Sequence, residues 1–135
     1  DLDHNSLTGS IPPQLSTLTA LTELDVSTDD LRGTIPTQLS TLTALTRLDL
    51  SFNQLTGTIP SQLGALTLLE QVYLHTNQLT GTIASRLGAL TSLRVLWLES
   101  NLLTGAVPSE LCAIGLLGFA VDLAEVVCAC CDCCG

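Results

Sequence analysis

A 24-residue repeat runs through this chain of 135 residues and constrains its fold more than any other feature. Successive copies open at Leu24, Leu48, Val72 and Leu96, and a truncated copy precedes them at Asp1. One copy cannot bury enough apolar surface to offset the entropy lost when its own backbone is ordered. The copies must therefore stack on one another, and the period predicts a solenoid in which each turn contacts its neighbours.

Aligning the copies shows which positions repeat. The clearest polar column reads Asn5, Asp29, Asn53, Asn77 and Asn101, and a later column reads Pro12, Pro36, Pro60, Ala84 and Pro108. Alternation around Leu48 and Leu50 predicts a short strand with aliphatic side chains inward. We expect the asparagine side chains to be buried where this strand ends and to bond turn backbone groups as a ladder. The proline ends a second extended segment, and the apolar spacing of three in residues 38–45 predicts a 3₁₀-like segment.

Residues 48–69 read Leu-Asp-Leu-Ser-Phe-Asn-Gln-Leu-Thr-Gly-Thr-Ile-Pro-Ser-Gln-Leu-Gly-Ala-Leu-Thr-Leu-Leu. This pattern resembles the plant-type leucine-rich repeat family, and the resemblance covers residues 1 to about 117. It implies an α/β repeat fold, a curved right-handed solenoid with a parallel β-sheet on its concave face and short 3₁₀ or helical convex segments. Receptor ectodomains and secreted polygalacturonase inhibitors share this fold, so the resemblance implies binding rather than catalysis. Asp29 and Ala84 depart from the pattern and leave those two corners in doubt.

All six cysteines lie near the C-terminal end: Cys112, Cys128, Cys130, Cys131, Cys133 and Cys134. An even number in a small acidic chain favours disulfides and an oxidising, extracellular setting. Neighbouring cysteines do not pair readily, because adjacent Cα atoms lie about 3.8 Å apart and disulfides need about 4.4 to 6.8 Å. Zinc binding is the alternative, since Cys130 and Cys133 have the two-residue gap of zinc sites, and free thiols are a third.

We expect two parts, a solenoid over residues 1–117 and a disulfide-rich cap with a cysteine-rich tail over residues 118–135. Leu111-Cys-Ala113, just before this second part, and the Cys-x-Cys-Cys-x-Cys-Cys end of this second part also resemble the tails of some leucine-rich repeat proteins of diatoms and related algae. We expect no metal site in it.

The charge of the chain excludes several kinds of partner. It has 13 acidic residues, four arginines and no lysine, giving a net charge of -9. Nucleic acid and anionic membrane surfaces both call for a basic surface. The longest apolar run, residues 111–121, is too short to cross a bilayer. No signal peptide is evident, and the start inside a repeat suggests a processed or truncated chain. We expect one secreted or cell-surface domain, and any glycosylation to be O-linked because no Asn-x-Ser/Thr sequon occurs.

The outward strand positions differ between copies, so we expect function there. One column reads Asp1, Asp25, Asp49, Tyr73, Trp97, the next reads Asp3, Ser27, Ser51, His75, Glu99, and a third reads His4, Thr28, Phe52, Thr76, Ser100. Our candidate ligand-binding residues on the concave face are Phe52, Tyr73, His75 and Trp97, flanked by Arg47, Arg94 and Glu70. Such a patch suits anchoring a protein or stacking on sugar rings. The alternative is that the aromatic rings only cover one another and shield the sheet.

Charged neighbours on this face have simpler interpretations. Glu23 falls beside Arg47, and Glu70 beside Arg94, as expected for surface ion pairs. Asp25 and Asp49 also meet, a spacing that suits a cation or paired-carboxylate hydrolysis. A flat sheet offers no pocket, however, and Arg47 can neutralise the pair. With no nucleophile beside a base and no phosphate loop, we expect neither enzyme activity nor a cofactor.

Two further hypotheses concern other surfaces. Thr56-Gly-Thr58 and Thr80-Gly-Thr82 place hydroxyls in a lattice similar to those of ice-binding proteins, although Arg32 and Ala106 interrupt its outer rows and threonine is a common strand residue. The first turn lacks a polar cap, so end-to-end self-association into a fibre is possible beside the simpler interpretation of a cut fragment. We predict a non-catalytic extracellular protein for protein or glycan recognition or a structural module, with the fibre and ice binding as alternatives.

Overall fold

The computed structural model describes residues 7–122 and the backbone of residues 126 and 127. Five parallel strands form what we call the main sheet, which is the predicted concave sheet. In spatial order its strands are β11 (Gly118–Ala120), β8 (Val95–Trp97), β6 (Gln71–Tyr73), β4 (Arg47–Asp49) and β2 (Glu23–Asp25). The three pairs from β2 to β8 join residues 24 positions apart, as Leu24 with Leu48, and β8 pairs with β11 at a separation of 23 residues.

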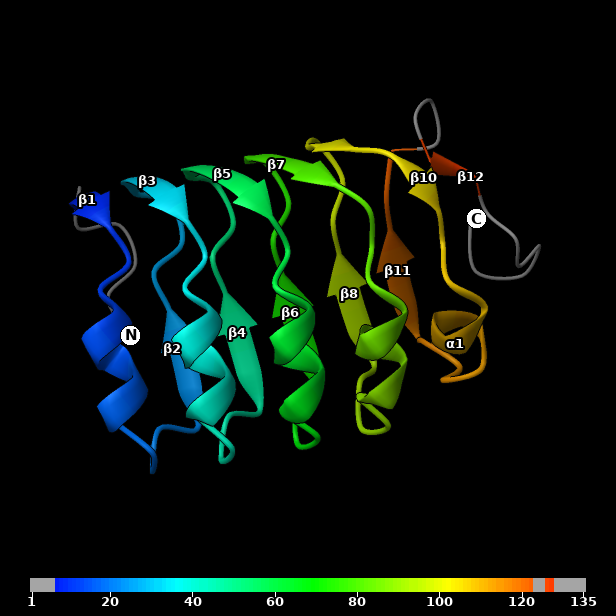
Figure 1. Cartoon of the computed structure of the whole chain (residues 1–135), viewed down its shortest axis with the longest axis horizontal. Coiled ribbons are helices and arrows are strands. Elements are labelled where there is room, and N and C mark those ends of the chain that lie inside the picture. The colour runs from blue at the N-terminus through cyan, green and yellow to red at the C-terminus, as the bar shows by residue number, and fades with distance from the viewer. Residues whose placement is uncertain (1–6, 123–125, 128–135) are drawn as a thin grey trace.

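A second sheet runs along the adjoining edge of every turn (Figure 1). It consists of β1 (Thr8–Ser10), β3 (Asp30–Thr34), β5 (Gln54–Thr58), β7 (Gln78–Gly81) and β9 (Leu102–Leu103). Here the partners are 22 residues apart, so Thr34 pairs with Thr56 and Thr58 with Thr80. A short pair, β10 (Gly105–Ala106) with β12 (Val126–Val127), follows it. The two sheets therefore have different staggers.

Short helices cover the side opposite the main sheet (Figure 1). They are the 3₁₀ helices η1 (Pro13–Thr17), η2 (Thr37–Thr41), η3 (Ser61–Ala65) and η4 (Ser85–Ala89), and the α-helix α1 (Ser109–Cys112). The predicted 3₁₀ segments are thus confirmed. Ala84 has φ -71° and ψ 133°, close to the -63° and 122° of Pro60, so this departure from the pattern leaves its corner unchanged.

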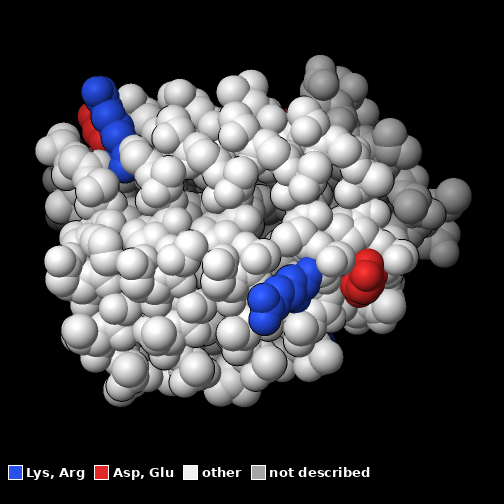
Figure 2. All heavy atoms as spheres, in the orientation of Figure 1, with Lys and Arg blue, Asp and Glu red and all other residues white. Residues whose placement is uncertain are grey.

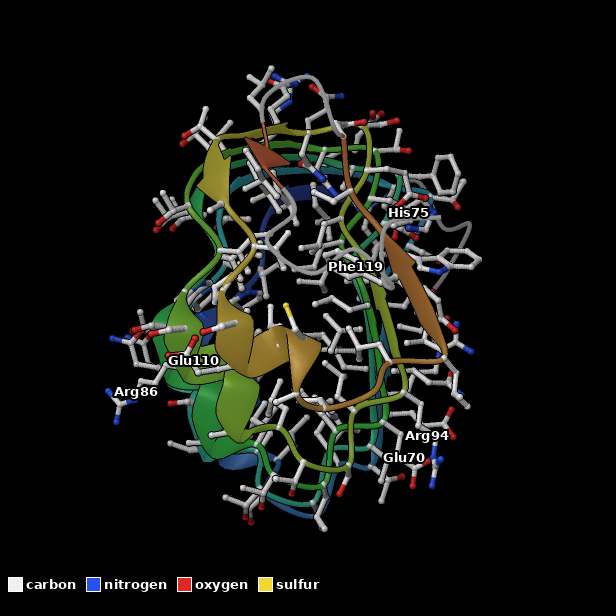
Figure 3. The ribbon with its side chains drawn as sticks, turned by 90° about the vertical axis from the view of Figure 1, so that its right-hand side faces the viewer. Glu70, His75, Arg86, Arg94, Glu110 and Phe119 are labelled. Carbon is white, nitrogen blue, oxygen red and sulfur yellow. The ribbon has the colours of Figure 1, made fainter. Side chains whose placement is uncertain are left out.

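One continuous aliphatic core fills the space between the main sheet and the helices. Leu48 and Leu50 from the main-sheet turn, Leu55 from β5 and Leu63 from η3 are almost completely buried. The equivalent residues of the other copies join the same cluster. Phe119 and other half-buried residues of the last turn pack against its C-terminal end, where Figure 3 shows Phe119 pointing inward. The core therefore belongs to the stack and not to a single turn.

The asparagine ladder is present as predicted. The Asn77 side-chain oxygen accepts the Leu55 N–H at 2.9 Å, and its amide donates to the carbonyls of Leu50 at 2.9 Å and Leu74 at 3.2 Å. Asn53 and Asn101 repeat this arrangement. Asp29 accepts the Leu7 N–H through Oδ1 at 2.8 Å and keeps the corner, but its buried Oδ2 has no hydrogen-bond partner.

The residue before each ladder position has a left-handed backbone. Thr28, Phe52, Thr76 and Ser100 have φ between 53° and 59°. This conformation is costly for residues other than glycine. It turns the chain out of the main sheet and leaves the side chain at the rim of the outer face.

The C-terminal region is described only in part. β11 extends the main sheet beyond residue 117, and α1 continues the row of helices. Cys112 in α1 is disulfide-bonded. The other five cysteines lie outside the described residues, so the disulfide-rich cap, its connectivity, the zinc alternative and the domain division at residue 117 remain predictions. Within the described residues, no helix has the length and apolar character needed to span a membrane.

Candidate functional site

The structure brings four predicted site residues together on the outer face of the main sheet. We call Phe52, Tyr73, His75 and Trp97 the aromatic cluster. Ring centroids are 4.9 Å apart for Phe52 and His75, 5.4 Å for His75 and Trp97, and 5.2 Å for Tyr73 and Trp97. Each of these pairs meets edge to face, with interplanar angles of 71° to 81°. Such pairs add stability beyond that of area burial, so the rings hold one another in place.

The backbone explains how the four rings meet. Tyr73 and Trp97 are directly paired in β6 and β8. His75 follows Tyr73 by two residues and therefore faces the same way. Phe52 comes from the preceding turn, where its left-handed backbone, with φ 53°, sets the ring against His75. Figure 3 shows His75 on the outer side of the main sheet, away from the core.

The cluster presents apolar surface to solvent at both ends. Phe52 is 51% exposed and Trp97 is 40% exposed, whereas Tyr73 and His75 between them are half-buried. Neighbouring rings stand nearly perpendicular, so no two adjacent rings form a flat platform. A flat platform is what stacking along a polysaccharide would need. Two exposed rings around a fixed centre instead resemble the anchor residues of protein interfaces.

A second group of polar residues occupies the N-terminal half of the same face. The Arg47 guanidinium donates to Asp25 at 3.2 Å and to Asp49 at 2.8 Å, and lies 5.2 Å from the centre of the Tyr73 ring. Burial works against its charge, but the hydrogen bond and charge of Asp49, and the charges of Asp25 and Tyr73, raise the pKa of Arg47 above its usual value. Arg47 thus stays charged and fixed beside the aromatic cluster.

Both oxygens of each of these two carboxylates accept hydrogen bonds. Asp49 Oδ1 accepts the Ser51 hydroxyl at 2.6 Å and the Ser51 N–H at 3.1 Å, while its Oδ2 accepts Arg47. Asp25 bonds Ser27 and Arg47 in the same way. Each carboxylate is therefore held by three hydrogen bonds, one of them from Arg47.

Neither predicted ion pair of this face, Glu23 with Arg47 or Glu70 with Arg94, forms in the described part of the chain. Glu23 lies beside Arg47 in register, but Arg47 reaches the two aspartates instead. Glu70 and Arg94 lie together at the edge of the main sheet, far from His75 in Figure 3, and form no ion pair within the described part of the chain. Of the predicted flanking residues, Arg47 alone contacts the aromatic cluster through a described interaction.

Glu99 is not among the candidate site residues predicted from the sequence, but the structure shows an unusual environment for its side chain. Its Oε2 is buried without a hydrogen-bond partner, and so is Nδ1 of His75 in the neighbouring turn. The position was visible in the sequence, because Glu99 shares a column with His75 and follows Trp97 by two residues. The absence of a hydrogen-bond partner for Glu99 could not be predicted from the sequence, because it depends on where the basic side chains lie in the folded chain.

A separate surface lies between the second sheet and the helices. It is a shallow groove of about 520 Å³ that includes Thr34, Thr58 and Thr82 in its lining. A further hollow of about 300 Å³ continues it past Thr34 toward Ser10. Figure 2 shows that this side of the molecule is free of charged residues over most of its area. Two other threonines of the predicted lattice, Thr56 and Thr80, instead bond glycine carbonyls of the preceding strand.

Three solved structures show what the chain is similar to. It is 35% identical to the plant peptide hormone receptor RGFR1 in complex with RGF2, with a TM-score of 0.84, covering 85% of this chain and 19% of that one. It is 41% identical to a chain of the BIR3–SERK2 complex from Arabidopsis thaliana, with a TM-score of 0.82 and coverage of 90% and 66%. It is also 41% identical to a plant ice-binding protein, with a TM-score of 0.76 and coverage of 79% and 34%.

The chain thus spans about one fifth of the RGFR1 chain and about two thirds of the BIR3–SERK2 one. No curated protein matches it in sequence. The sequence model described as Leucine Rich Repeat matches residues 1–18, 44–66 and 92–114. Together with the stacked parallel strands and 3₁₀ helices, these matches show that the chain belongs to the plant-type leucine-rich repeat family.

Proposed function

We propose that this protein is a non-catalytic recognition module of the cell exterior, and that it binds a peptide or protein segment through the aromatic cluster. The observation that supports this most is the pair of exposed rings, Phe52 and Trp97, held edge to face around Tyr73 and His75. Rigid, partly exposed aromatic residues with a fixed arginine beside them are the typical anchors of protein interfaces. Similarity to a peptide hormone receptor supports the same choice.

The ring geometry favours a protein ligand over a glycan. A sugar chain stacks on adjacent ring faces that lie in one plane, and here the Trp97 ring is turned through 71° to 81° from its neighbours His75 and Tyr73. A peptide can place one side chain over each exposed ring and use the polar groups between them. An extracellular location follows from this proposal and agrees with the disulfide chemistry expected of the tail.

The test is selection of a random peptide library on the immobilised full chain. Peptides that bind the wild-type chain are then measured against a Tyr73→Ala/Trp97→Ala variant and a Thr58→Ala/Thr82→Ala control on the groove. We expect the aromatic variant to weaken binding at least about tenfold, as loss of anchor residues does, with no change for the control. Peptides that bind both variants equally well would contradict the proposal.

Ice binding is a second candidate, and the groove favours it. The methyl groups of Thr34, Thr58 and Thr82 fill the space that a side chain at Gly57, Gly81 or Gly105 would need, so these threonines are fixed at regular spacing. They line an uncharged groove, and the chain is similar to a plant ice-binding protein. Thermal hysteresis that is present in the wild type and lost in Thr58→Tyr/Thr82→Tyr, but kept in Tyr73→Ala/Trp97→Ala, would establish it. Absence of thermal hysteresis in the wild type would remove it.

The fibre hypothesis has no such support. It depends on the first turn and the cysteine tail, which lie largely outside the described residues. Sizing of the purified protein under non-reducing conditions tests it, because a fibre subunit would form a concentration-dependent series of oligomers and a monomer would not.

A further inference from the structure

Glu99 is a carboxylate that the chain itself leaves without a partner. It follows Trp97 on the same outer face, since the intervening Leu98 is completely buried. Its Oε2 is buried and accepts no hydrogen bond, and no other interaction of its side chain is present in the described part of the chain. A half-buried carboxylate without a hydrogen-bond donor is costly, so a cation that reaches its solvent-facing side would stabilise the charge even though Oε2 itself stays covered.

None of the four arginines lies beside Glu99 in the described part of the chain. The chain has four arginines and no lysine, and all four arginines lie in the described part; of its two histidines, His75 neighbours Glu99 but forms no hydrogen bond or ion pair with it. Arg47 is held by Asp25 and Asp49. Arg86 lies on the helix side and Arg94 at the far edge of the main sheet, as Figure 3 shows, and the fourth arginine is in the second sheet. An arginine or lysine partner for Glu99 must therefore come from another molecule.

The neighbourhood of Glu99 is suited to a cationic group. Trp97, 40% exposed, has the ring type with the strongest cation–π attraction. His75 stands 5.4 Å from it, with its Nδ1 unpartnered. The preceding turns show the same combination already filled, because Arg47 lies against the Tyr73 ring while it bonds the carboxylates of Asp25 and Asp49. At Glu99 the carboxylate and a neighbouring aromatic ring are present, but no arginine of the described residues lies between them.

We propose that Glu99 and Trp97 form the recognition site for a basic side chain, arginine or lysine, of a bound peptide. The ammonium or guanidinium group donates a hydrogen bond to the solvent-facing side of the Glu99 carboxylate and lies against the indole ring of Trp97. The net charge of -9 attracts such a peptide from a distance. This inference rests on the proposed peptide recognition and names the chemistry of the ligand.

The test uses N-acetyl-arginine amide and its uncharged analogue N-acetyl-citrulline amide, titrated against the full chain. Trp97 is the only tryptophan, so its indole N–H gives a single NMR signal that reports on this site alone. We expect arginine to shift that signal and citrulline to leave it unchanged. Glu99→Gln, which keeps the shape of the side chain, should weaken arginine binding about tenfold, the size of a lost charge-assisted hydrogen bond.

Glu23→Gln is the matched control, since it removes the same charge from the exposed far end of the main sheet. It should change arginine binding less than about twofold, because exposed charges that far apart are screened by salt. Equal effects of the two substitutions, or equal binding of citrulline and arginine, would overturn the proposal. Library-selected peptides that require Trp97 but bind Glu99→Gln as tightly as wild type would also overturn it, and would leave peptide recognition intact.

Discussion

At the corners that follow β2, β4, β6 and β8, a residue with left-handed backbone precedes a buried or half-buried asparagine or aspartate. The asparagine was predictable, because a buried turn needs a side chain that both donates and accepts, and Asn77 does both. The left-handed residue was not. Threonine and phenylalanine disfavour this conformation, so their presence in the column gave no signal for it.

Relief of this strain should be measurable at Thr76, whose φ is 56°. We compare Thr76→Gly with Thr104→Gly, a position with ordinary backbone whose hydroxyl makes no hydrogen bond in the described part of the chain. Both changes carry the entropic cost of glycine, but Thr76→Gly also removes about 1–2 kcal/mol of left-handed strain. Urea unfolding should therefore show Thr76→Gly to be the more stable variant. The reverse order would show that the corner is not strained.

The ladder makes a reciprocal prediction for two exchanges between aspartate and asparagine. Asp29→Asn should raise the free energy of unfolding by about 1–2 kcal/mol, because it gives the unpartnered Oδ2 position a donor. Asn77→Asp should lower it by about 2–4 kcal/mol, because it removes the donor that serves the Leu50 and Leu74 carbonyls. Urea denaturation at neutral pH measures both. Equal shifts in the same direction would contradict the ladder.

At the scale of elements, the repeat shows which residues are equivalent but not how strands are staggered. In the main sheet the stagger matches the 24-residue repeat from β2 to β8, so aligned columns correctly placed Tyr73 beside Trp97. In the second sheet partners are 22 residues apart, so Thr58 pairs with Thr80 and not with Thr82. Stagger depends on the direction of the backbone in space. The angles between the aromatic rings and the pairing of Arg47 with Asp25 and Asp49 depend on side-chain rotamers. Aligned sequence positions give no information about rotamers.

The helices stack through glycine at two places. A side chain at Gly64 of η3 would overlap the Arg86 carbonyl of η4, and one at Gly88 would overlap Glu110 of α1. Gly64→Ala should therefore lower the free energy of unfolding by about 1–3 kcal/mol, since one helix must move. Ser40→Ala is the control, because Ser40 is the equivalent residue of η2 and already has a Cβ. A Gly64→Ala variant as stable as this control would contradict such close packing.

At the scale of the whole molecule, stability should vary along the stack. The turn of β4 is bonded on both sides, whereas β2 ends the main sheet within the described residues. In a solenoid each turn is stabilised by its neighbours, so a terminal turn opens more easily than a central one. Hydrogen exchange should show amides of β4 and β6 to be protected more strongly than those of β2. Equal protection in all turns would indicate that the stack unfolds only as one unit.

The two sides of the molecule also differ in the residues that they expose. The main sheet carries the aromatic cluster, the bound Arg47 and the unpartnered Glu99, while the helix side is largely uncharged (Figure 2). The copies are alike where they hold the stack together and differ on the outer face of the main sheet. We place recognition at that face.

Mapping of a bound peptide by backbone amide chemical shifts tests this placement most directly. A library-selected peptide is added to the isotope-labelled full chain, and the amides that shift are located on the two sides. The account predicts that shifts gather on β4, β6 and β8 around Phe52, Tyr73, His75 and Trp97. Shifts gathered instead along the groove at Thr34, Thr58 and Thr82, with the aromatic cluster unchanged, would contradict it.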